Sequence, residues 1–133
     1  MKLKLQENKV NQLLLTEASG ETLASDFSLG FEPVFSEDDP SEFRIVFDFE
    51  YITKDDKYLR VDFHSIFKTD SEIDQGFKDS KFPIVNAPAI AFPFLRAFVA
   101  NLLISGGHQP ILLPSINFSN FKKEEISPPQ NPD

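Results

Sequence analysis

Residues 91–110 constrain the fold more than any other segment, because they have the composition of a helix without a polar face. Between Phe94 and Ile104 the only polar side chains are Arg96 and Asn101, which lie roughly 140° apart at about 100° per residue. A helix on the outside of a small soluble domain normally has one polar side. We therefore expect this helix to be covered on more than one side.

Spacings of three and four residues sort the large apolar side chains of this helix into two neighbouring ridges. The ridges are Phe94, Phe98 and Leu102, and beside them Leu95, Val99 and Leu103. One ridge can pack on a sheet, while each large apolar side chain left in water forgoes roughly 1.5–3 kcal/mol. We expect these residues to form an isologous interface with a second copy of the helix. The alternative is that the C-terminal segment of the same chain folds over the helix.

Period-two alternation of apolar and polar side chains predicts strands ahead of the helix. Residues 43–51 and 59–67 both alternate and are joined by the polar turn TKDDK, which is typical of an antiparallel hairpin. Residues 27–35 alternate too, with Pro33 indicating an edge strand or a bend. Residues 3–16 form a fourth strand with imperfect alternation. Pairing of consecutive strands is the simplest order.

The predicted fold class is α+β: a four-stranded antiparallel sheet followed by one long helix and an extended C-terminal segment, assembling through helices and sheet edges. Pro93 fits the first turn of the helix, and Gly106 and Gly107 supply its left-handed stop. We expect one domain over residues 1–121. Residues 122–133 are charged and rich in proline, which indicates a disordered tail.

Charge and cysteine content restrict the partners and the compartment. The net charge of −8, with only 13 Lys and Arg, argues against nucleic acid as a partner. The chain has no cysteine and no secretory signal at residues 1–10, which favours a cytoplasmic location. The apolar residues 82–104 contain three prolines together with Asn86 and Arg96, so we expect no membrane insertion.

No pattern of catalytic or metal-binding residues is present in the sequence. The two histidines, His64 and His108, lie in no metal-ligand spacing, and the phosphate-loop, nucleophile-elbow and H-E-x-x-H motifs are all absent. We therefore expect neither an enzyme nor a bound metal or other cofactor.

Residues 92–118 carry a series of motifs: a Phe-Pro-Phe helix start, an Arg two residues later, a Gly stop, and a proline-containing extended run that ends in Asn-Phe. These are Phe92, Pro93, Phe94, Arg96, Leu102, Gly106, Pro110, Leu113, Asn117 and Phe118. The series resembles, without a gap, the pattern of the SecB family of protein-export chaperones. The four strands before the helix also match that family in order.

The resemblance implies a tetramer, built as a pair of dimers with the helices between the sheets. It also implies a chaperone that holds unfolded chains and passes them to the motor ATPase SecA. The chain departs from the family pattern at Ala97 and Asn101, where the family has acidic residues, and at Ser115, where it has proline. The second helix of the family is shortened here to about one turn by the prolines of SPPQNPD. Some relatives of the family chaperone antitoxins instead.

A chaperone of this kind needs exposed apolar surface that binds extended clients. With fifteen Phe in the chain, we expect an open client-binding groove, and its candidate residues are Phe27, Leu29, Phe31, Phe35, Ile111, Leu113, Phe118 and Phe121. The alternative is that these residues fill the core. Asp48, Glu50 and Asp62 should lie on the solvent face of the hairpin, where the resemblance places SecA. Alternatively they only solubilise that face, partly neutralised by Arg44 and Arg60.

The sequence thus favours an ATP-independent chaperone that binds unfolded polypeptides, in particular preproteins awaiting export, and works as a homo-oligomer, either a tetramer or a dimer. A second hypothesis is an adaptor or antitoxin-associated chaperone that uses the same groove for one partner. A third is a domain that binds a small molecule between helix and sheet.

Overall fold

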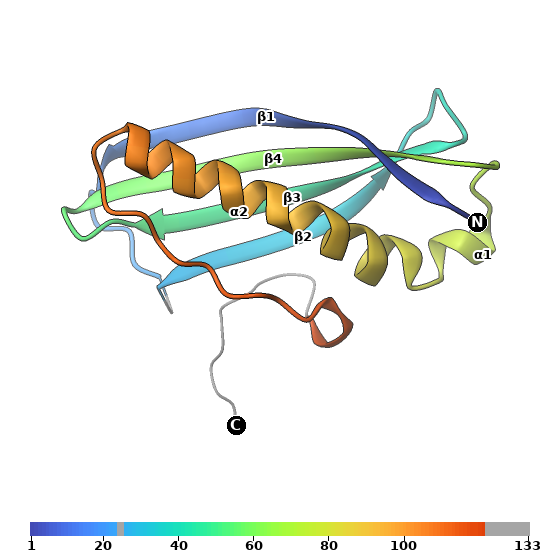
Figure 1. Cartoon of the computed structure of the whole chain (residues 1–133). Helices are drawn as coiled ribbons and strands as arrows, with labels where there is room; N and C mark the ends of the chain where they lie inside the picture. The colour runs from blue at the N-terminus through green and yellow to red at the C-terminus, as the bar shows by residue number, and fades with distance from the viewer. Residues whose placement is uncertain (24–25, 122–133) are drawn as a thin grey trace.

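The chain folds into a four-stranded antiparallel sheet with a long helix on one face, in a computed structural model that describes residues 1–23 and 26–121 (Figure 1). The strands are β1 (Leu3–Glu17), β2 (Phe27–Phe35), β3 (Glu42–Ile52) and β4 (Lys57–Thr69). The helices are α1 (Gln75–Lys78), η1 (Phe82–Asn86), α2 (Ala87–Ser105) and η2 (Phe118–Asn120). The predicted α+β class is confirmed. The predicted tail, residues 122–133, lies outside the described residues.

The predicted order of the strands is wrong at one place, because the sheet has the order β1-β4-β3-β2. β1 pairs with β4 from Leu3 opposite Thr69 to Glu17 opposite Lys57, and not with β2. The connection over residues 18–26 explains the difference. It is longer than the roughly two to five residues of a hairpin turn, and it can span the roughly 14 Å between the outer strands of a four-stranded sheet.

The edge strand β1 contains two β-bulges. Its register with β4 shifts between Leu5 and Glu7 and again between Val10 and Gln12. Each bulge adds one residue to the strand and so shifts the alternation of the side chains that follow. Leu5, Val10 and Leu13 lie opposite Phe67, Phe63 and Val61 of β4, on the same side of the sheet. The bulges are the reason for the imperfect alternation in residues 3–16.

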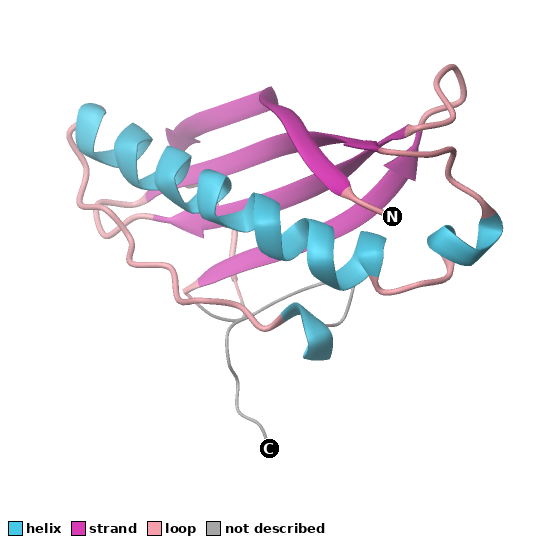
Figure 2. Cartoon of the chain, turned by 45° about the vertical axis from the view of Figure 1, so that its right-hand side comes forward, coloured by secondary structure: helices cyan, strands magenta, loops and turns pink. Residues whose placement is uncertain are grey.

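The core lies between α2 and the face of the sheet on which the large apolar side chains of the strands gather. α2 crosses this face, while the opposite face carries no helix in the described part of the chain (Figure 2). Leu95, Val99 and Leu103 of α2 are fully buried. Their fully buried counterparts on the strands are Leu29, Ile45, Phe47, Phe49, Leu59, Val61 and Phe67.

The helix begins earlier than predicted, and Pro93 lies inside it. α2 starts at Ala87, directly after the π-helical turn η1, and Pro88 takes the first-turn position that was expected for Pro93. Proline removes one hydrogen bond to the carbonyl of the residue four positions before it, here Ala89. Ala89 and Pro93 both lie on the exposed side of α2, where water can reach that carbonyl.

At the end of α2 the predicted left-handed conformation is found at Gly107 and not at Gly106. Gly107 has φ of 87° and takes the left-handed conformation, whereas Gly106 has φ of −86°. Gly106 is instead favoured by close packing, because a Cβ at this position would lie 3.1 Å from the carbonyl oxygen of Leu102.

One side of the helix stays exposed within the chain. Ile90, Phe94 and Ile104 are 43%, 50% and 59% exposed, so the described C-terminal segment does not cover them. By length and composition residues 82–105 could cross a membrane. A core helix has the same composition, however, and the burial of Leu95 and Val99 against the sheet shows that α2 is one.

The burial of α2 predicts a strong asymmetry between two leucines. Leu95→Ala should lower the free energy of unfolding by about 2–5 kcal/mol, because it leaves a cavity between helix and sheet. Leu112→Ala is the matched control, since Leu112 is 93% exposed and its truncation should change stability by less than about 0.5 kcal/mol. Urea denaturation followed by circular dichroism measures both, and equal losses would contradict this assignment of the core.

Candidate functional site

Four aromatic rings pack together where the C-terminal segment meets β2 and α2. The ring of Phe118 approaches Phe31 edge-on at 5.5 Å between centroids and Phe92 at 5.9 Å. Phe121 lies 4.9 Å from Phe31 and 5.1 Å from Phe118. Such pairs contribute about 0.5–1.5 kcal/mol each beyond their buried area. We call the surface formed by Phe31 of β2 and Phe92 of α2, on which Phe118 and Phe121 rest, the aromatic groove.

The structure therefore brings together three of the eight expected client-binding residues: Phe31, Phe118 and Phe121. Leu113 is buried and Ile111 half-buried at the neighbouring part of the C-terminal segment. Phe27 and Leu29 are 3% and 0% exposed and pack in the core, as Phe31 and Phe118 do at 5% and 4%.

Phe35 lies at the end of β2, four residues beyond Phe31. It packs on Phe43 with 5.6 Å between the ring centroids, and the Lys78 ammonium lies 5.1 Å above its ring. The sequence prediction omitted Phe92, although the Phe-Pro-Phe motif contained the signal. Helical spacing from Phe92 through Leu95 and Val99 to Leu103 places it on the buried side of α2.

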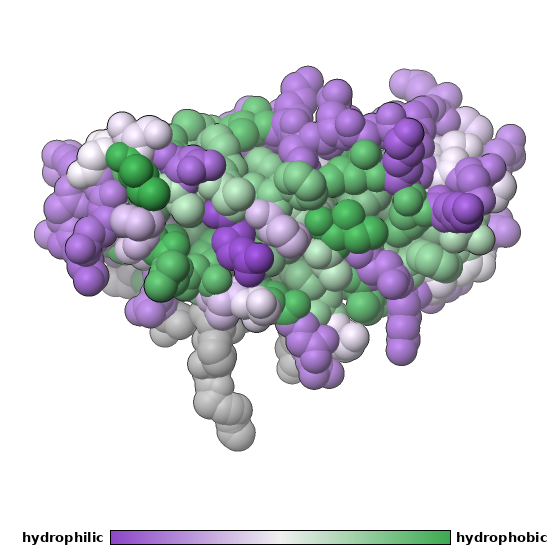
Figure 3. Space-filling model, in the orientation of Figure 1, coloured by the Kyte–Doolittle hydropathy of each residue, from purple (hydrophilic) through white to green (hydrophobic). Residues whose placement is uncertain are grey.

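A second apolar surface follows the uncovered side of α2 and continues onto β1. We call it the outer ridge, and it comprises Ile90, Phe94, Phe98, Leu102 and Ile104 with Val10 and Leu13 of β1. The two elements meet where the Phe98 ring lies 6.0 Å from that of Phe63, the residue paired with Val10. Hydrophobic residues extend across the face of the molecule that carries α2 (Figure 3).

The expected interface with a second copy divides between the two sides of the helix. Phe94 is exposed, and Phe98 and Leu102 are half-buried, so all three belong to the outer ridge. Leu95, Val99 and Leu103 are 0% exposed and pack on the sheet, so they have no surface with which to contact another subunit. Both ridges looked equivalent in the sequence because both are apolar.

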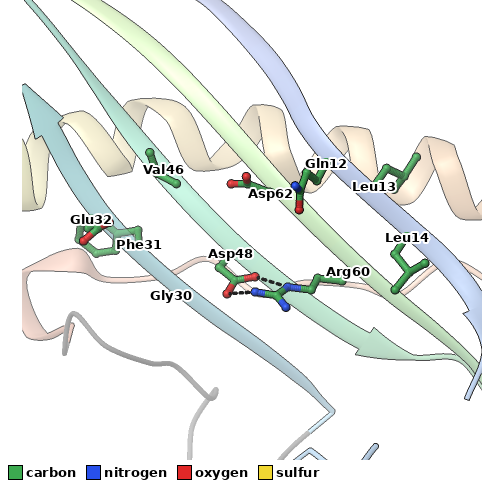
Figure 4. Close-up of a pocket in the computed structure, with 10 residues that line it drawn as sticks. All are labelled: Gln12, Leu13, Leu14, Gly30, Phe31, Glu32, Val46, Asp48, Arg60 and Asp62. Atoms are coloured by element: carbon green, nitrogen blue, oxygen red, sulfur yellow. Dashed lines mark hydrogen bonds and ion pairs between the residues drawn. The ribbon is translucent and has the colours of Figure 1, made fainter. Parts of the chain in front are cut away.

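The opposite face of the sheet is polar and hollowed (Figure 4). The hollow has a volume of about 1160 Å³ and is lined by Gln12, Leu14, Gly30, Glu32, Val46, Asp48, Arg60 and Asp62, among others. Asp48 and Arg60 form a bidentate pair across β3 and β4, with 3.1 Å from Nε to Oδ1 and 3.0 Å from NH2 to Oδ2. The expected position of Asp48, Glu50 and Asp62 on the face away from the helix agrees with the pairing of the strands.

Each of the three expected carboxylates, Asp48, Glu50 and Asp62, is engaged by a neighbour. Arg60 binds Asp48, and this hydrogen bond raises the pKa of the guanidinium. The Tyr58 hydroxyl donates to Glu50. Asn11 of the second β1 bulge donates to Asp62 Oδ2 over 2.7 Å. Arg60 neutralises the charge of Asp48, whereas Tyr58 and Asn11 are neutral donors that fix the orientation of Glu50 and Asp62.

His64 takes part in the same polar network in a defined tautomer. Its Nδ1 lies 2.9 Å from Arg44 NH1, and its Nε2 lies 3.1 Å from Asp62 Oδ1. A guanidinium only donates, so Nδ1 accepts and Nε2–H donates to the carboxylate. The described residues contain no group of three His, Asp or Glu side chains that could hold a metal ion.

Residues 37–127 match the family model of SecB, described as preprotein translocase subunit SecB. The chain belongs to the SecB family. Two protein-export SecB proteins match parts of it: that of Roseobacter denitrificans is 30% identical over 69 residues, and that of Anaplasma phagocytophilum is 36% identical over 44 residues. The matches cover 52% and 33% of this chain, and they span only 40% and 28% of the length of those SecB proteins.

Two solved structures resemble the fold. A SecB-like chaperone of Mycobacterium tuberculosis, solved in complex with a ChAD peptide from the HigA1 antitoxin, superposes with a TM-score of 0.64 at 11% identity, over 86% of this chain and 88% of that one. A protein of unknown function from Streptococcus agalactiae gives a TM-score of 0.51 at 13% identity, over 86% of this chain and 98% of that one. At these identities the likeness concerns the SecB fold alone.

The polar face yields a prediction for the ionisation of Tyr58. Burial, with the hydrogen bond to Glu50 as the second cause, raises the pKa of Tyr58 to about 12. A tyrosine whose pKa is raised on folding stabilises the fold fully below its unfolded pKa of about 10, and this stability is lost as the pH rises through the folded value. In a Tyr51→Phe background, where Tyr58 is the sole tyrosine, absorbance titration should give a midpoint near 12.

Glu50→Gln is the matched variant for this titration. It removes the negative charge beside the hydroxyl and should lower the midpoint toward that of free tyrosine, without changing the burial of the ring. An unchanged midpoint in Glu50→Gln would show that burial alone perturbs Tyr58.

Proposed function

We propose that this chain is a chaperone that binds unfolded polypeptides without ATP, in the aromatic groove and along the neighbouring edge of β2. The proposal is carried by one observation: the groove of Phe31 and Phe92 lies beside an edge strand in a member of the SecB family. β2 pairs only with β3 among the described residues, so one side of its backbone is available to an extended client. Backbone pairing supplies affinity without sequence preference, and the aromatic rings accept apolar side chains.

The clients fitted by this site are extended segments with aromatic or aliphatic side chains. Preproteins awaiting export are the proposed class, in keeping with the names of the protein-export relatives. We place the protein in the cytoplasm, where such chains are made. Nothing in the proposed action requires a catalytic group, a metal or a nucleotide.

A matched pair of variants on β2 tests the client site. Phe31→Leu should weaken the binding of reduced, carboxymethylated lactalbumin by roughly two- to tenfold, the factor expected from losing aromatic pairs in the groove. Phe35→Leu should leave it unchanged, because Phe35 packs on Phe43 at the far end of the same strand. Fluorescence anisotropy of the labelled client measures both. Wild-type protein that neither binds this client nor delays the aggregation of a denatured protein would overturn the proposed function.

We further propose that the chain works as a homo-oligomer, a dimer or a tetramer, through the outer ridge and the β1 edge. Ile90, Phe94 and Ile104 are large apolar side chains that are 43–59% exposed. Burying each of them against a second copy would contribute roughly 1.5–3 kcal/mol. β1 is the other edge strand of the sheet, and Val10 and Leu13 continue the ridge onto it.

Charge introduced on the ridge tests this assembly. Phe94→Asp should lower the mass measured by sedimentation at micromolar concentration, because a buried unpaired carboxylate strongly destabilises an interface. Val34→Asp is the control, since Val34 is similarly exposed, at 42%, but lies on β2, opposite Arg44, at the other edge of the sheet. A monomeric wild-type protein, or an assembly that Phe94→Asp leaves intact, would contradict the proposed interface.

The polar face of the sheet is the proposed contact for the motor ATPase SecA, through Asp48, Glu50 and Asp62. A basic partner would have to compete with Arg60 for Asp48, so this contact should be weak and sensitive to salt.

A dedicated adaptor for one antitoxin is the second candidate function. It is favoured by the fold likeness to the mycobacterial SecB-like chaperone that was solved with an antitoxin peptide. Binding of several unrelated unfolded proteins with similar affinity would support the general chaperone, and tight binding of one partner only would support the adaptor.

A further inference from the structure

The C-terminal segment itself occupies the aromatic groove. We call residues 108–121 the arm. Phe118 is 4% exposed and Leu113 7% exposed, and Phe118 and Phe121 rest on Phe31. The surface assigned to clients is therefore filled by a segment of the same chain, which is itself extended and apolar as a client would be.

His108 N donates to Leu103 O, and beyond this residue the described arm is held to the rest of the chain by side chains and not by its backbone. Within the described part of the chain, residues 109–116 make no backbone–backbone hydrogen bond, and the distal turn bonds only to itself, from Asn120 N to Asn117 O and from Phe121 N to Phe118 O. Leu112 is 93% exposed. An extended segment without backbone pairing separates from its neighbours at little cost beyond its side-chain contacts.

The middle of the arm spans a hollow. About 570 Å³ lie between Pro110, Ile111 and Leu112 on the arm and Tyr51 and Ile52 at the end of β3. The arm is anchored at its two ends, and between them Leu113 packs into the core beside this hollow.

The proximal anchor is a polar contact to the β3–β4 turn. His108 Nδ1 lies 3.1 Å from Oδ2 and 3.3 Å from Oδ1 of Asp55, and the His108 side chain is only 13% exposed. Asp55 is held in place by the Thr53 hydroxyl, which donates to it over 2.6 Å. Gly107, with its left-handed φ of 87°, immediately precedes this contact and permits the chain to change direction there.

We propose that the arm is a displaceable strap, which covers the client groove in the free chain and leaves it when a client binds, with His108 and Asp55 as its latch. This inference rests on the proposed function, because it concerns access to the same groove. A client that places aromatic side chains on Phe31 and Phe92 replaces contacts of the same kind made by Phe118 and Phe121. The exchange therefore costs little, and the latch determines how often the groove is open.

Loss of the latch should raise client affinity. A client binds only the fraction of molecules in which the strap is open, and the apparent affinity scales with that fraction. Removing one side-chain hydrogen bond shifts such an equilibrium by roughly two- to tenfold. His108→Ala should therefore tighten client binding by about that factor, although His108 does not line the groove.

The absence of cysteine permits a direct test of strap opening. In a Leu113→Cys variant of the full chain the single thiol lies on the buried side of the strap, and its rate of reaction with a soluble disulfide reagent reports opening. The rate should rise when carboxymethylated lactalbumin is added, and should rise without client when His108→Ala is added. Asp55→Ala should act as His108→Ala does, whereas His64→Ala is the matched control, because His64 contacts Arg44 and Asp62 on the polar face.

Circular dichroism establishes that each variant is folded before its thiol is measured. A thiol that client leaves unchanged or protects, or that reacts equally with and without the latch, would overturn the strap. Failure of the wild-type chain to bind any unfolded polypeptide would count against the proposed function instead, and the effect of His108→Ala on the thiol in the absence of client would still decide whether the latch exists.

Discussion

The packing of α2 on the sheet is the interaction on which the rest of the structure depends. The burial of Leu95, Val99 and Leu103 against the strands fixes the rotation of the helix about its axis. That rotation leaves Ile90, Phe94 and Ile104 on the far side and points Phe92 toward the groove of Phe31 and Phe118. A helix with one polar side could not produce this arrangement, because its second face would only meet water. Without a polar side, α2 has two apolar sides, and the sheet of the same chain covers one of them.

The sequence predicts the strands and the long helix, but it does not predict which strands pair with each other. Alternation identifies the strands because a half-buried strand must place apolar side chains on one face, and the register of β3 with β4 follows from their short turn. Alternation does not state which strand lies beside which, so the place of β1 next to β4 was missed. In the sequence Pro93 fits a helix start. An internal proline is tolerable here because Ala89 is exposed, and the sequence alone does not give that exposure.

The same limit applies to the candidate site. Phe27, Leu29 and Phe31 are equivalent in pattern, and the ring contacts with Phe118 and Phe121 are made by Phe31. Asp48, Glu50 and Asp62 were placed on the correct face by alternation. Their engagement by Arg60, Tyr58 and Asn11 depends on register and on a bulge, neither of which composition reveals.

The two bulges of β1 have a consequence for how copies of this chain can associate. A straight edge of this length would accept a neighbouring strand in many alignments, including open-ended stacks of the kind that become fibrils. The bulges after Leu5 and Val10 interrupt the regular hydrogen-bonding pattern of this edge, so that a second strand can pair with it in few registers. This favours a closed oligomer of defined size over an open-ended stack. The two bulges of β1 thus disfavour open-ended self-association of a chain that exposes a large apolar surface.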